Sequence, residues 1–463
     1  MLLRGKSRKE GLNIIIVGGG KVGATLVERL SRENHDITLI DKNRKRLEDI
    51  TSTYDVMGVE GNGASFAVQK EAGIEDAHLL IAVTGSDEQN LLCCLFAKKA
   101  GNCNTIARVR NPLYNHEIRF IQEELGLSMT INPEYAAATE IARILRFPSA
   151  IKIDTFSKGR VELIKFLVPE NSPIDNCSLI DISHKIKTDV LVCAVERKDE
   201  VVIPNGSFVI KAGDTISIVA SPTKARDFIK EIGVRAHQVG NAMIVGGGTM
   251  AYYLAEQLLS MGIHVKIIER DEERCEQLSE LLPKAMIIHG DATNQNILLE
   301  EGIQNSEAFV SLTGIDEGNI FLSLFAQSCS KAKVITKINR ISFGDIINDF
   351  QLGSLIYPKF ITSEYITRYV RAMQNSLGSN VETLYHLIEN KVEALEFHIH
   401  EGAPVVDIAL EDLPIRDNTL IACINHAGTI IRPNGKTKIS VGDTVIIITT
   451  HKGLGDIKDI LQK

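Results

Sequence analysis

Short hydrophobic runs alternate with longer amphipathic stretches along the first third of the chain. The runs at 14–17, 37–40 and 79–83 are apolar at successive positions, which is typical of strands buried on both faces of a parallel sheet. The stretches at 22–30 and 90–99 have helical spacing instead. Strands that alternate with helices predict a doubly wound parallel sheet, which is a Rossmann-like α/β fold. The remaining elements expected in this lobe are strands at 55–59, 105–109 and 129–131 and a helix at 116–124.

The hydrophobic pattern changes after Asn132-Pro133. We expect a helix at 134–145 that leaves the first lobe as a crossover arm. Beyond it, hydrophobic positions alternate with period two, as in 161–168, which indicates half-buried strands. We therefore predict a small α+β lobe, in which Gly213-Asp214 forms a tight turn rather than a ligand site.

This whole arrangement occurs twice. The run at 13–17, which ends in Gly18-Gly19-Gly20, returns at 241–245 before Gly246-Gly247-Gly248, an offset of 228 residues. A duplicated unit of this length predicts two α/β lobes, each followed by a small α+β lobe. The expected boundaries are an N-terminal tail at 1–11, α/β lobes at 12–147 and 239–374, and small lobes at 148–233 and 380–463.

Composition narrows the class of protein. In 463 residues, 44% are hydrophobic and 24% charged, as in ordinary globular proteins, and the longest apolar runs have strand length. A net charge of −8 without a basic stripe argues against nucleic acid as a partner. The eight cysteines are scattered, which favours a reducing compartment. The basic residues before Leu12 lack an apolar core and do not form a secretory signal.

The first glycine run has the spacing of a dinucleotide-binding loop. Gly18 permits the tight turn, Gly20 lets a pyrophosphate approach the backbone, and Gly23 lets the helix pack on its strand. The phosphates would lie at the helix N-terminus, where free N–H groups favour negative charge. Asp41 follows Gly18 by 23 residues, at the end of the second strand, where an acid binds ribose hydroxyls. This acid favours NAD(H) or an adenosine nucleotide over NADP(H), although the nearby Lys42-x-Arg44 weakens that preference.

The second glycine run keeps the same features with small changes. Gly246 and Gly248 remain, Ala251 occupies the third position, where only a small side chain is needed, and Glu269 replaces the acid. Asp291 stands where the first copy has Asn62. We therefore expect the two pockets to differ, with NAD(H) preferred in the first copy and weaker or less selective binding of adenosine nucleotides in the second.

Polar residues follow the later strands of each copy. Thr84 and Gly85 lie at a strand end, at the carboxyl edge of the sheet, and we expect them to contact a ligand. Ser86 and Asp87 fit two interpretations equally well, a capping box completed by Gln89 or ligand contact. Their neighbours on the next strands, Arg108 and its counterpart Lys337, would either bind phosphate or form ordinary ion pairs.

No catalytic or metal site is predicted. A dehydrogenase needs an acid or base beside the nicotinamide, and the twelve histidines form no repeated constellation with a carboxylate. His398 and His400 share one face of an expected strand, with His426 later in the lobe, but a polar strand face explains them better than a metal ion.

The order of lobes and the motifs together resemble the TrkA family of Trk-type potassium uptake regulators, whose RCK (or KTN) domains are each paired with a TrkA-C lobe. The resemblance covers the chain from Leu12 onward. The matching motifs are Gly18–Gly23, Gly61–Ser65, Thr84–Asn90, Ala107–Pro112, Gly290–Thr293, Thr313–Asn319 and the two Pro-Asn-Gly and Gly-Asp pairs.

The resemblance implies a regulatory protein rather than an enzyme. Members are cytoplasmic and peripheral on the inner face of the membrane, assemble typically as tetramers, and gate a potassium-translocating membrane subunit in response to NAD(H), ATP or ADP. The implied nucleotide-binding residues are Gly18, Gly19, Gly20, Lys21, Val22, Gly23, Asp41, Thr84, Gly85 and Arg108 in the first copy, and Gly246, Gly247, Gly248, Thr249, Met250, Glu269, Thr313, Gly314 and Lys337 in the second.

Two other functions remain possible on the sequence alone. One is a soluble NAD-dependent oxidoreductase with duplicated Rossmann lobes, and the other is the detached gating ring of a different ligand-gated channel or antiporter. A homo-oligomer is also expected because the helix at 134–145 carries an apolar stripe that a second copy would cover.

Overall fold

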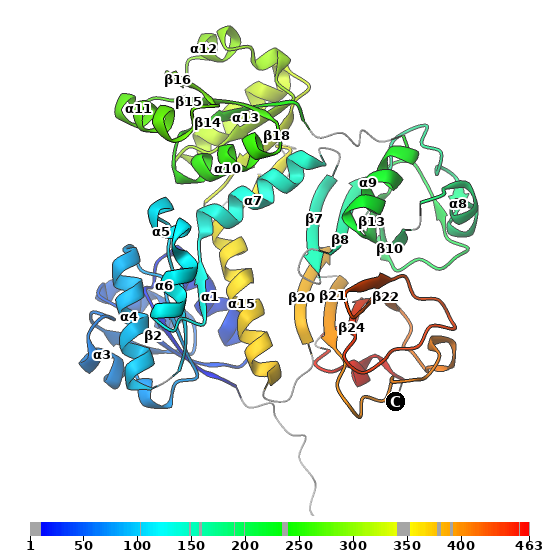
Figure 1. The fold of residues 1–463 in the computed structure, drawn as a ribbon, viewed down its shortest axis with the longest axis horizontal. Coiled ribbons are helices and arrows are strands. Elements are labelled where there is room, and N and C mark those ends of the chain that lie inside the picture. The colour runs from blue at the N-terminus through cyan, green and yellow to red at the C-terminus, as the bar shows by residue number, and fades with distance from the viewer. Residues whose placement is uncertain are drawn as a thin grey trace, which may run out of the picture. The chain divides into compact units, whose positions relative to one another are not determined.

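The computed structural model describes residues 11–101, 103–147, 150–156, 160–188, 190–198, 200–233, 239–339, 352–376, 381–388, 392–452 and 454–462. Nearly all of the N-terminal tail lies outside these residues. The chain forms two compact units, and neither is a sequential half (Figure 1). The first unit combines the two α/β lobes, up to Thr139 and from Asn241 to Thr367, and the second combines the two small lobes.

The first α/β lobe is a six-stranded parallel sheet in the order β3-β2-β1-β4-β5-β6. This order reverses direction between β1 and β4, so a crevice forms at their carboxyl ends. Its strands are β1 (Asn13–Val17), β2 (Asp36–Asp41), β3 (Met57–Glu60), β4 (Leu79–Ala82), β5 (Asn104–Arg108) and β6 (Met129–Ile131). Its helices are α1 (Lys21–Arg32), α2 (Arg44–Thr53), α3 (Phe66–Glu71), the 3-10 turn η1 (Ile74–Asp76), α4 (Asp87–Ala100), α5 (Pro112–His116), α6 (Ile118–Glu124) and α7 (Pro133–Arg146).

The second α/β lobe repeats this topology in the order β16-β15-β14-β17-β18-β19. The doubly wound fold predicted from the hydrophobic runs is therefore confirmed in both copies. The strands are β14 (Asn241–Val245), β15 (His264–Glu269), β16 (Met286–His289), β17 (Ala308–Ser311), β18 (Lys333–Lys337) and β19 (Ser354–Ile356). The helices are α10 (Thr249–Ser260), α11 (Glu272–Leu281), α12 (Gln295–Glu300), η3 (Ile303–Asn305), α13 (Asp316–Cys329) and α15 (Pro358–Ser376).

Each small lobe contains a five-stranded antiparallel sheet, in the orders β11-β10-β13-β8-β7 and β20-β21-β24-β22-β23. The first has β7 (Ala150–Phe156), β8 (Val161–Leu167), β9 (Cys177–Ser178), α8 (Leu179–Lys185), β10 (Leu191–Arg197), β11 (Glu200–Val202), β12 (Val209–Ile210), β13 (Thr215–Ala220) and α9 (Pro222–Glu231). The second has β20 (Val381–Ile388), β21 (Val392–His398), η4 (Leu410–Asp412), β22 (Thr419–His426), β23 (Thr429–Ile431), β24 (Thr444–Thr449) and η5 (Ile457–Ile460).

The two small lobes share one hydrophobic core. Phe156 and Leu163 of the first pack in the same buried cluster as Ala394, Ile446 and Ile448 of the second. Because residues more than 200 positions apart exclude water together, the two copies depend on each other for this core. Separating the two halves would expose it.

The predicted turns of the small lobes are confirmed. Gly213 and Gly442 have φ of 85° and 87°, a left-handed conformation that favours glycine. In both turns the following aspartate accepts a backbone N–H: Asp214 Oδ2 from Lys211 at 2.8 Å and Asp443 Oδ2 from Ser440 at 2.8 Å. These carboxylates therefore close turns.

The helix predicted at 116–124 is confirmed as α6, which begins two residues later, at Ile118. A short helix before it, α5, was not predicted; Asn111 caps it and Pro112 starts it. One expectation for the helices is wrong. The apolar stripe of the crossover helix is not available to a second copy. Ala138, Ile141 and Leu145 of α7 are 0% exposed within the chain itself.

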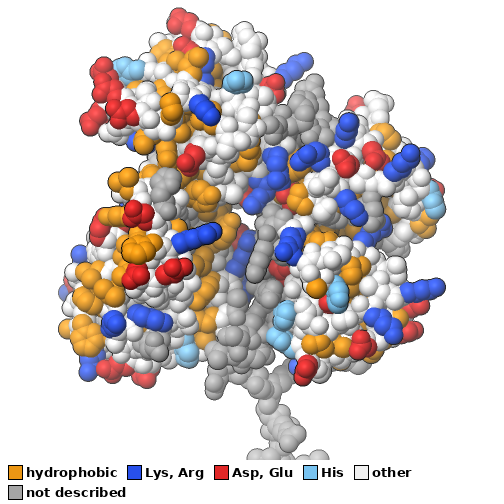
Figure 2. Space-filling model, viewed as in Figure 1, with side chains coloured by type: hydrophobic (Ala, Val, Ile, Leu, Met, Phe, Trp, Pro, Cys, Tyr) orange, Lys and Arg blue, Asp and Glu red, His pale blue; other side chains and the backbone are white. Residues whose placement is uncertain are grey.

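The described residues contain no helix that is long and apolar enough to cross a membrane. The largest exposed hydrophobic side chains of the first lobe are Leu113, at 74%, and Phe120, at 64%, on α5 and α6. Figure 2 shows hydrophobic side chains gathered over this side of the lobe.

Candidate functional site

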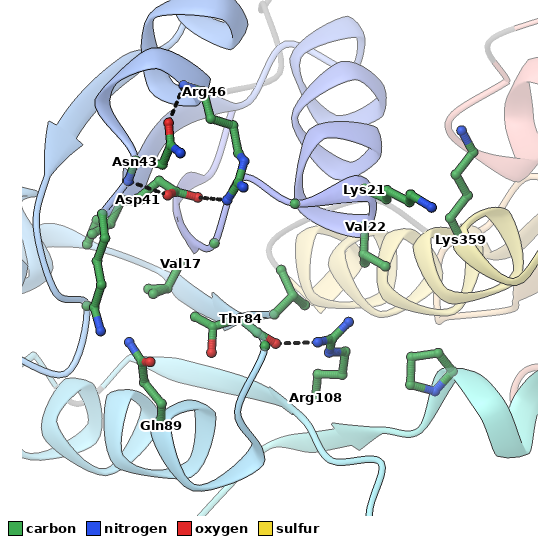
Figure 3. Close-up of a pocket in the computed structure, with 18 of the residues that line it drawn as sticks. Val17, Lys21, Val22, Asp41, Asn43, Arg46, Thr84, Gln89, Arg108 and Lys359 are labelled. Atoms are coloured by element: carbon green, nitrogen blue, oxygen red, sulfur yellow. Dashed lines mark hydrogen bonds and ion pairs between the residues drawn. The ribbon is translucent and has the colours of Figure 1, made fainter. Parts of the chain in front are cut away.

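The carboxyl ends of β1, β2 and β4 surround a cavity of about 780 Å³, which we call the first pocket (Figure 3). It lies where the strand order reverses, as expected for a ligand site in a doubly wound sheet. Ten of its lining residues come from three segments that follow these strands: Val17, Gly18, Gly20, Lys21, Val22, Asp41, Lys42, Asn43, Thr84 and Gly85.

The glycine loop has the geometry that its spacing predicts. Gly18 has φ of 103°, and a Cβ there would lie 3.1 Å from the backbone of Thr84. A Cβ on Gly23 would lie 1.8 Å from the carbonyl oxygen of Gly18, so the third glycine permits the helix to start close to the loop. A Cβ on Gly20 would meet nothing within 4 Å. The second glycine therefore faces open space in which a ligand can approach the start of α1.

Asp41 fixes the glycine loop as well as lining the pocket. Its side chain is 7% exposed, and Oδ2 accepts the N–H of Gly19 at 2.6 Å. Its other oxygen accepts the N–H of Asn43 at 2.7 Å, and Arg46 forms an ion pair with Oδ2 at 3.2 Å. Figure 3 shows these groups together at one end of the pocket. A ribose that binds Asp41 must share the carboxylate with Arg46.

The basic residue that faces Asp41 was not identified from the sequence. Arg44, which the sequence suggests as an influence on nucleotide choice, forms an exposed ion pair with Glu48 at 2.9 Å. Arg46 lies two positions further along α2 and lines the pocket instead. Residues two apart on a helix point in different directions. The residue at which α2 begins therefore decides which of the two arginines points into the pocket.

The segment after β4 is held by a buried asparagine. Asn90 is 0% exposed, and its Oδ1 accepts the backbone N–H of Thr84 at 2.8 Å and the Thr84 hydroxyl at 2.7 Å. Its amide donates to the carbonyl of Arg108 at 2.8 Å. Asn319 makes the same three bonds to Thr313 and Lys337 in the second copy. In each copy the ends of two neighbouring strands, β4 and β5 or β17 and β18, are thereby held in place beside the pocket.

The structure gives Ser86 and Asp87 structural contacts. Ser86 caps α4 by accepting the N–H of Gln89 at 3.2 Å, but the Gln89 side chain donates to Asn62 at 2.9 Å rather than back to Ser86. The capping box is thus only half formed. Asp87 Oδ2 accepts the N–H groups of Arg110 and Asn111, each at 2.8 Å. Thr84, Gly85 and Gln89 are the residues of this segment that line the pocket.

Arginines close the far side of the first pocket. Arg108 donates to the carbonyl of Thr84, and Arg110 donates to the carbonyl of Gly85 at 2.6 Å. Burial, together with the neighbouring Arg110, lowers the pKa of Arg108, while burial raises the pKa of Glu134 nearby. Arg108 Nε and Glu134 Oε2 are buried atoms without a hydrogen-bond partner among the described residues. Such groups fit a site that an anionic, hydrogen-bonding ligand completes.

The second lobe also contributes to the first pocket. Asn339, Pro358 and Lys359 line it, although they lie more than 200 residues after the first glycine loop. Figure 3 shows Lys21 and Lys359 at the end of the pocket opposite Asp41. Among the residues that the structure describes, six basic and two acidic side chains line the pocket, so its field favours a polyanion such as a pyrophosphate.

The equivalent second pocket is smaller and less basic. Its volume is about 440 Å³, and the described residues that line it all belong to the second lobe, with two basic and two acidic side chains among them. Glu269 Oε2 accepts the N–H of Gly247 at 2.5 Å, which matches the bond that Asp41 makes to Gly19. Asp291 lines this pocket, and hydrogen bonds from Thr293 lower its pKa. Lys337 donates to the carbonyl of Leu312 at 2.8 Å, and burial lowers its pKa.

Most of the predicted binding residues come together at the two pockets. Those that line the first are Gly18, Gly20, Lys21, Val22, Asp41, Thr84, Gly85 and Arg108, and those that line the second are Gly246, Gly248, Glu269, Thr313, Gly314 and Lys337. The others, Gly19, Gly23, Gly247, Thr249 and Met250, belong to the loops and helix starts behind the lining. Sequence reasoning missed Asn43, Arg46, Gln89, Arg110, Glu134, Asn339 and Lys359. Only Glu134 and Lys359 had a signal of their own, a charge in the first turn of a helix that begins with proline.

The histidines of the second small lobe do not gather around a metal site. The rings of His398 and His400 meet edge to face at 4.8 Å, and His426 Nδ1 lies 2.6 Å from Asp443 Oδ1. Across the part of the chain that the structure describes, no three His, Cys, Asp or Glu side chains are placed to hold a metal ion together.

Comparison with known families matches all four lobes. The TrkA-N domain family matches residues 14–133 and 242–358, and the TrkA-C domain family matches residues 163–233 and 394–462. A Trk system potassium uptake protein TrkA homolog from Archaeoglobus fulgidus is 32% identical over 97% of this chain and 100% of its own length. The Trk system potassium uptake protein TrkA of Halomonas elongata is 31% identical over 97% of this chain and 99% of its own.

Solved structures share the fold at lower identity. A structure of the GsuK channel aligns with a TM-score of 0.63 and 17% identity, over 96% of this chain and 78% of its own. The GsuK RCK domain aligns with a TM-score of 0.62 and 16% identity, over 96% of this chain and 94% of its own. At these identities the likeness establishes the fold alone.

Proposed function

Since this chain belongs to the TrkA family of Trk system potassium uptake proteins, we propose that it is the regulatory subunit that gates a potassium-translocating membrane subunit in response to nucleotides. The first pocket carries this proposal. It combines a glycine loop at a helix start, an acid at the end of β2 and six basic side chains, which together suit an adenosine ribose and a pyrophosphate.

The proposed ligand of the first pocket is NAD(H), with ATP and ADP as further regulatory ligands. The bound pyrophosphate would lie over Gly20 and the start of α1, with Lys21 and Arg108 close to its charge. The ribose would bind Asp41, in competition with Arg46. The second pocket would bind an adenosine nucleotide more weakly because its basic and acidic side chains are balanced in number.

Gating follows from differential binding. A ligand shifts a protein between two conformations only when it binds one of them more tightly. The first pocket provides a basis for such differential binding, because Asn339, Pro358 and Lys359 belong to a different lobe from the glycine loop. A nucleotide that contacts both lobes favours the arrangement in which both sets of contacts form.

The proposed site of action is the cytoplasmic face of the membrane, where the chain would be peripheral and assembled as a tetramer. The tetramer would use a surface other than the apolar stripe of α7, which the chain already buries. Leu113 and Phe120 on α5 and α6 are the most exposed of the large hydrophobic side chains described in the first lobe, and a second copy could cover them. Light scattering at micromolar concentration tests the tetramer, and a monomer would contradict it.

Calorimetric titration of NADH, NAD, ATP and ADP against the full chain tests the proposed function. We expect binding of at least NADH, and loss of the tighter binding event when Asp41 is changed to Ala. Co-purification with a Trk-type membrane subunit tests the partner. Absence of nucleotide binding would contradict the proposal, and steady oxidation of NADH with a small carbonyl substrate would favour an oxidoreductase instead.

A further inference from the structure

The helix after the second glycine loop reaches the first lobe. Helix α10 begins at Thr249, directly after Gly248, and carries Tyr253 about one turn, or 5.4 Å, further along. Tyr253 is 1% exposed, and its ring packs edge-on against Tyr135 of α7 with the centroids 5.4 Å apart. The second glycine loop is therefore connected by a single helical turn to the start of the first crossover helix.

The hydroxyl of Tyr253 bridges two groups of the first lobe. It donates to the carbonyl oxygen of Arg110 at 3.0 Å and accepts from the amide of Asn132 at 2.9 Å. Asn132 in turn caps α7, because its Oδ1 accepts the N–H of Tyr135 at 2.9 Å. A buried hydroxyl that donates and accepts at once holds both partners in one arrangement.

The peptide that Tyr253 holds belongs to the first pocket. The N–H of Arg110 donates to Asp87 at 2.8 Å, and its guanidinium donates to the carbonyl of Gly85 at 2.6 Å. Arg110 and Gly85 both line the pocket. A displacement of the Arg110 peptide must therefore move the pocket wall after β4.

Among the described residues, the hydroxyl bridge is not repeated at the pseudo-symmetric position. The counterpart of Tyr253 is Thr25, 228 residues earlier, whose hydroxyl donates to the carbonyl of Lys21 at 2.9 Å within its own helix. Helix α1 meets α15 through Arg29, which lies over the ring of Phe360 at 5.3 Å. The hydroxyl bridge consequently connects the second glycine loop to the first pocket, and its pseudo-symmetric position lacks a tyrosine.

We propose that Tyr253 is a positioning residue for the first pocket, and that it transmits nucleotide occupancy of the second glycine loop to the Arg110 peptide. This inference rests on the proposed function, in that both pockets must bind nucleotides. A phosphate at the start of α10 restrains that helix, and the two hydrogen bonds of Tyr253 carry the restraint to Arg110 and to the cap of α7. Without the hydroxyl, each pocket remains but the two act independently.

Hydrogen exchange tests the proposal in the full chain. In a Gly23→Ala background, in which the clash with the Gly18 carbonyl should abolish nucleotide binding in the first pocket, ATP is used to fill the second pocket. We expect ATP to slow exchange of the Arg110 and Asn111 amides by ~5-fold or more, the lower end of usual coupling between sites. Adding Tyr253→Phe keeps the ring and should reduce this effect to within about twofold of no change. Tyr252→Phe, which removes the adjacent hydroxyl, is the matched control and should keep it.

Calorimetry and thermal unfolding of the same variants separate positioning from a merely structural role. Equal ATP affinity and equal Tm in the Tyr253→Phe and Tyr252→Phe variants, with protection lost only in the former, support the proposal. Protection that persists in the Tyr253→Phe variant, or that is absent with Tyr253 present, overturns it. Failure of ATP to bind at all overturns the nucleotide assignment of the second pocket instead.

Asn132→Asp provides a second variant if Tyr253→Phe folds poorly. The carboxylate still accepts the N–H of Tyr135 at the start of α7, but it cannot donate to the Tyr253 hydroxyl. It should therefore keep the helix cap and lose the protection of the Arg110 amide. Retained protection in this variant also counts against the bridge.

Discussion

The two glycine-loop pockets descend from one repeated sequence, yet they are built from different parts of the chain. The first draws on both lobes and is lined by six basic side chains, whereas the second uses its own lobe and has equal numbers of basic and acidic ones. The shared features are the left-handed first glycine, the acid whose side chain accepts the next glycine N–H, and the buried asparagine that holds the strand ends. Duplication preserved the loop, and divergence of the surrounding side chains changed the charge.

The difference extends to the helices that begin at the pockets. Crossover helix α7 starts with Pro133-Glu134, and α15 starts with Pro358-Lys359, so equivalent positions carry opposite charge. Both pairs line the first pocket. One pocket has become a site that both α/β lobes form. Binding of its ligand can therefore depend on how these two lobes are arranged.

Exchanging the third residue of each glycine loop, Gly23 or Ala251, should have the largest effect on stability and NADH binding. Gly23→Ala places a Cβ 1.8 Å from the carbonyl oxygen of Gly18, so the loop must shift. We expect a loss of ~1–3 kcal/mol in the free energy of unfolding, as in overpacked sites, and no measurable NADH binding in the first pocket. The opposite change, Ala251→Gly, should cost only ~0.5–1 kcal/mol from helix propensity. Thermal unfolding and NADH titration of both variants check this, and unaltered NADH binding in Gly23→Ala would refute the loop geometry.

Removing Asp41 should weaken nucleotide binding in the first pocket more than in the second. Asp41→Ala removes a charge-assisted hydrogen bond to ribose, worth ~1.5–3 kcal/mol, so NADH affinity should fall roughly 10- to 100-fold. It also leaves the N–H groups of Gly19 and Asn43 without their acceptor, which should lower Tm while the fold persists. Asp41→Glu copies Glu269 and is the matched control. Calorimetry should show intermediate affinity for it, and NADH affinity unchanged in Asp41→Ala would sink the assignment.

The contribution of the second lobe to the first pocket predicts a smaller effect. Lys359→Ala removes one of six basic side chains from the pocket and should weaken NADH binding by ~2- to 5-fold, as for a partly exposed ion pair. The loss should shrink as salt is raised, because exposed charges are screened. Lys331→Ala, at an exposed position outside the pocket, is the control. Equal salt dependence in wild type and both variants would show that the second lobe adds no contact.

The smallest effect is expected at a position where the sequences of the two copies differ in charge. Asn62→Asp gives the first copy the acid that Asp291 supplies in the second, but Asn62 accepts from Ala64 and Gln89 rather than lining the pocket. An aspartate accepts the same two bonds, so NADH affinity should change by less than about twofold. A larger change in NADH affinity, measured by titration, would indicate that Asn62 belongs to the binding site. All of these variants are made in the full chain, because separating the halves would divide the core that the two small lobes share.

Much of the fold and the loops of both pockets could be predicted from the sequence alone. Buried parallel strands appear as continuous apolar runs, and a glycine loop needs a left-handed residue and close helix packing, so both leave local signals. Gly18, Gly20 and Asp41 could be assigned this way and line the first pocket. The helix at 116–124 could also be placed to within two residues, but the short α5 before it was missed because its signal is a cap, Asn111-Pro112, rather than a periodic pattern.

The sequence by itself determined the duplication, the two doubly wound sheets and the residues of each glycine loop, because these depend on neighbours within a few turns of chain. Only the tertiary structure decided that Arg46 rather than Arg44 faces Asp41, that α7 is buried by its own chain, and that Lys359 and Tyr253 reach the first lobe. These contacts join residues over 100 positions apart or depend on the direction of a helix start. Periodicity and spacing carry no information about such distances, which the packing of one lobe against another sets.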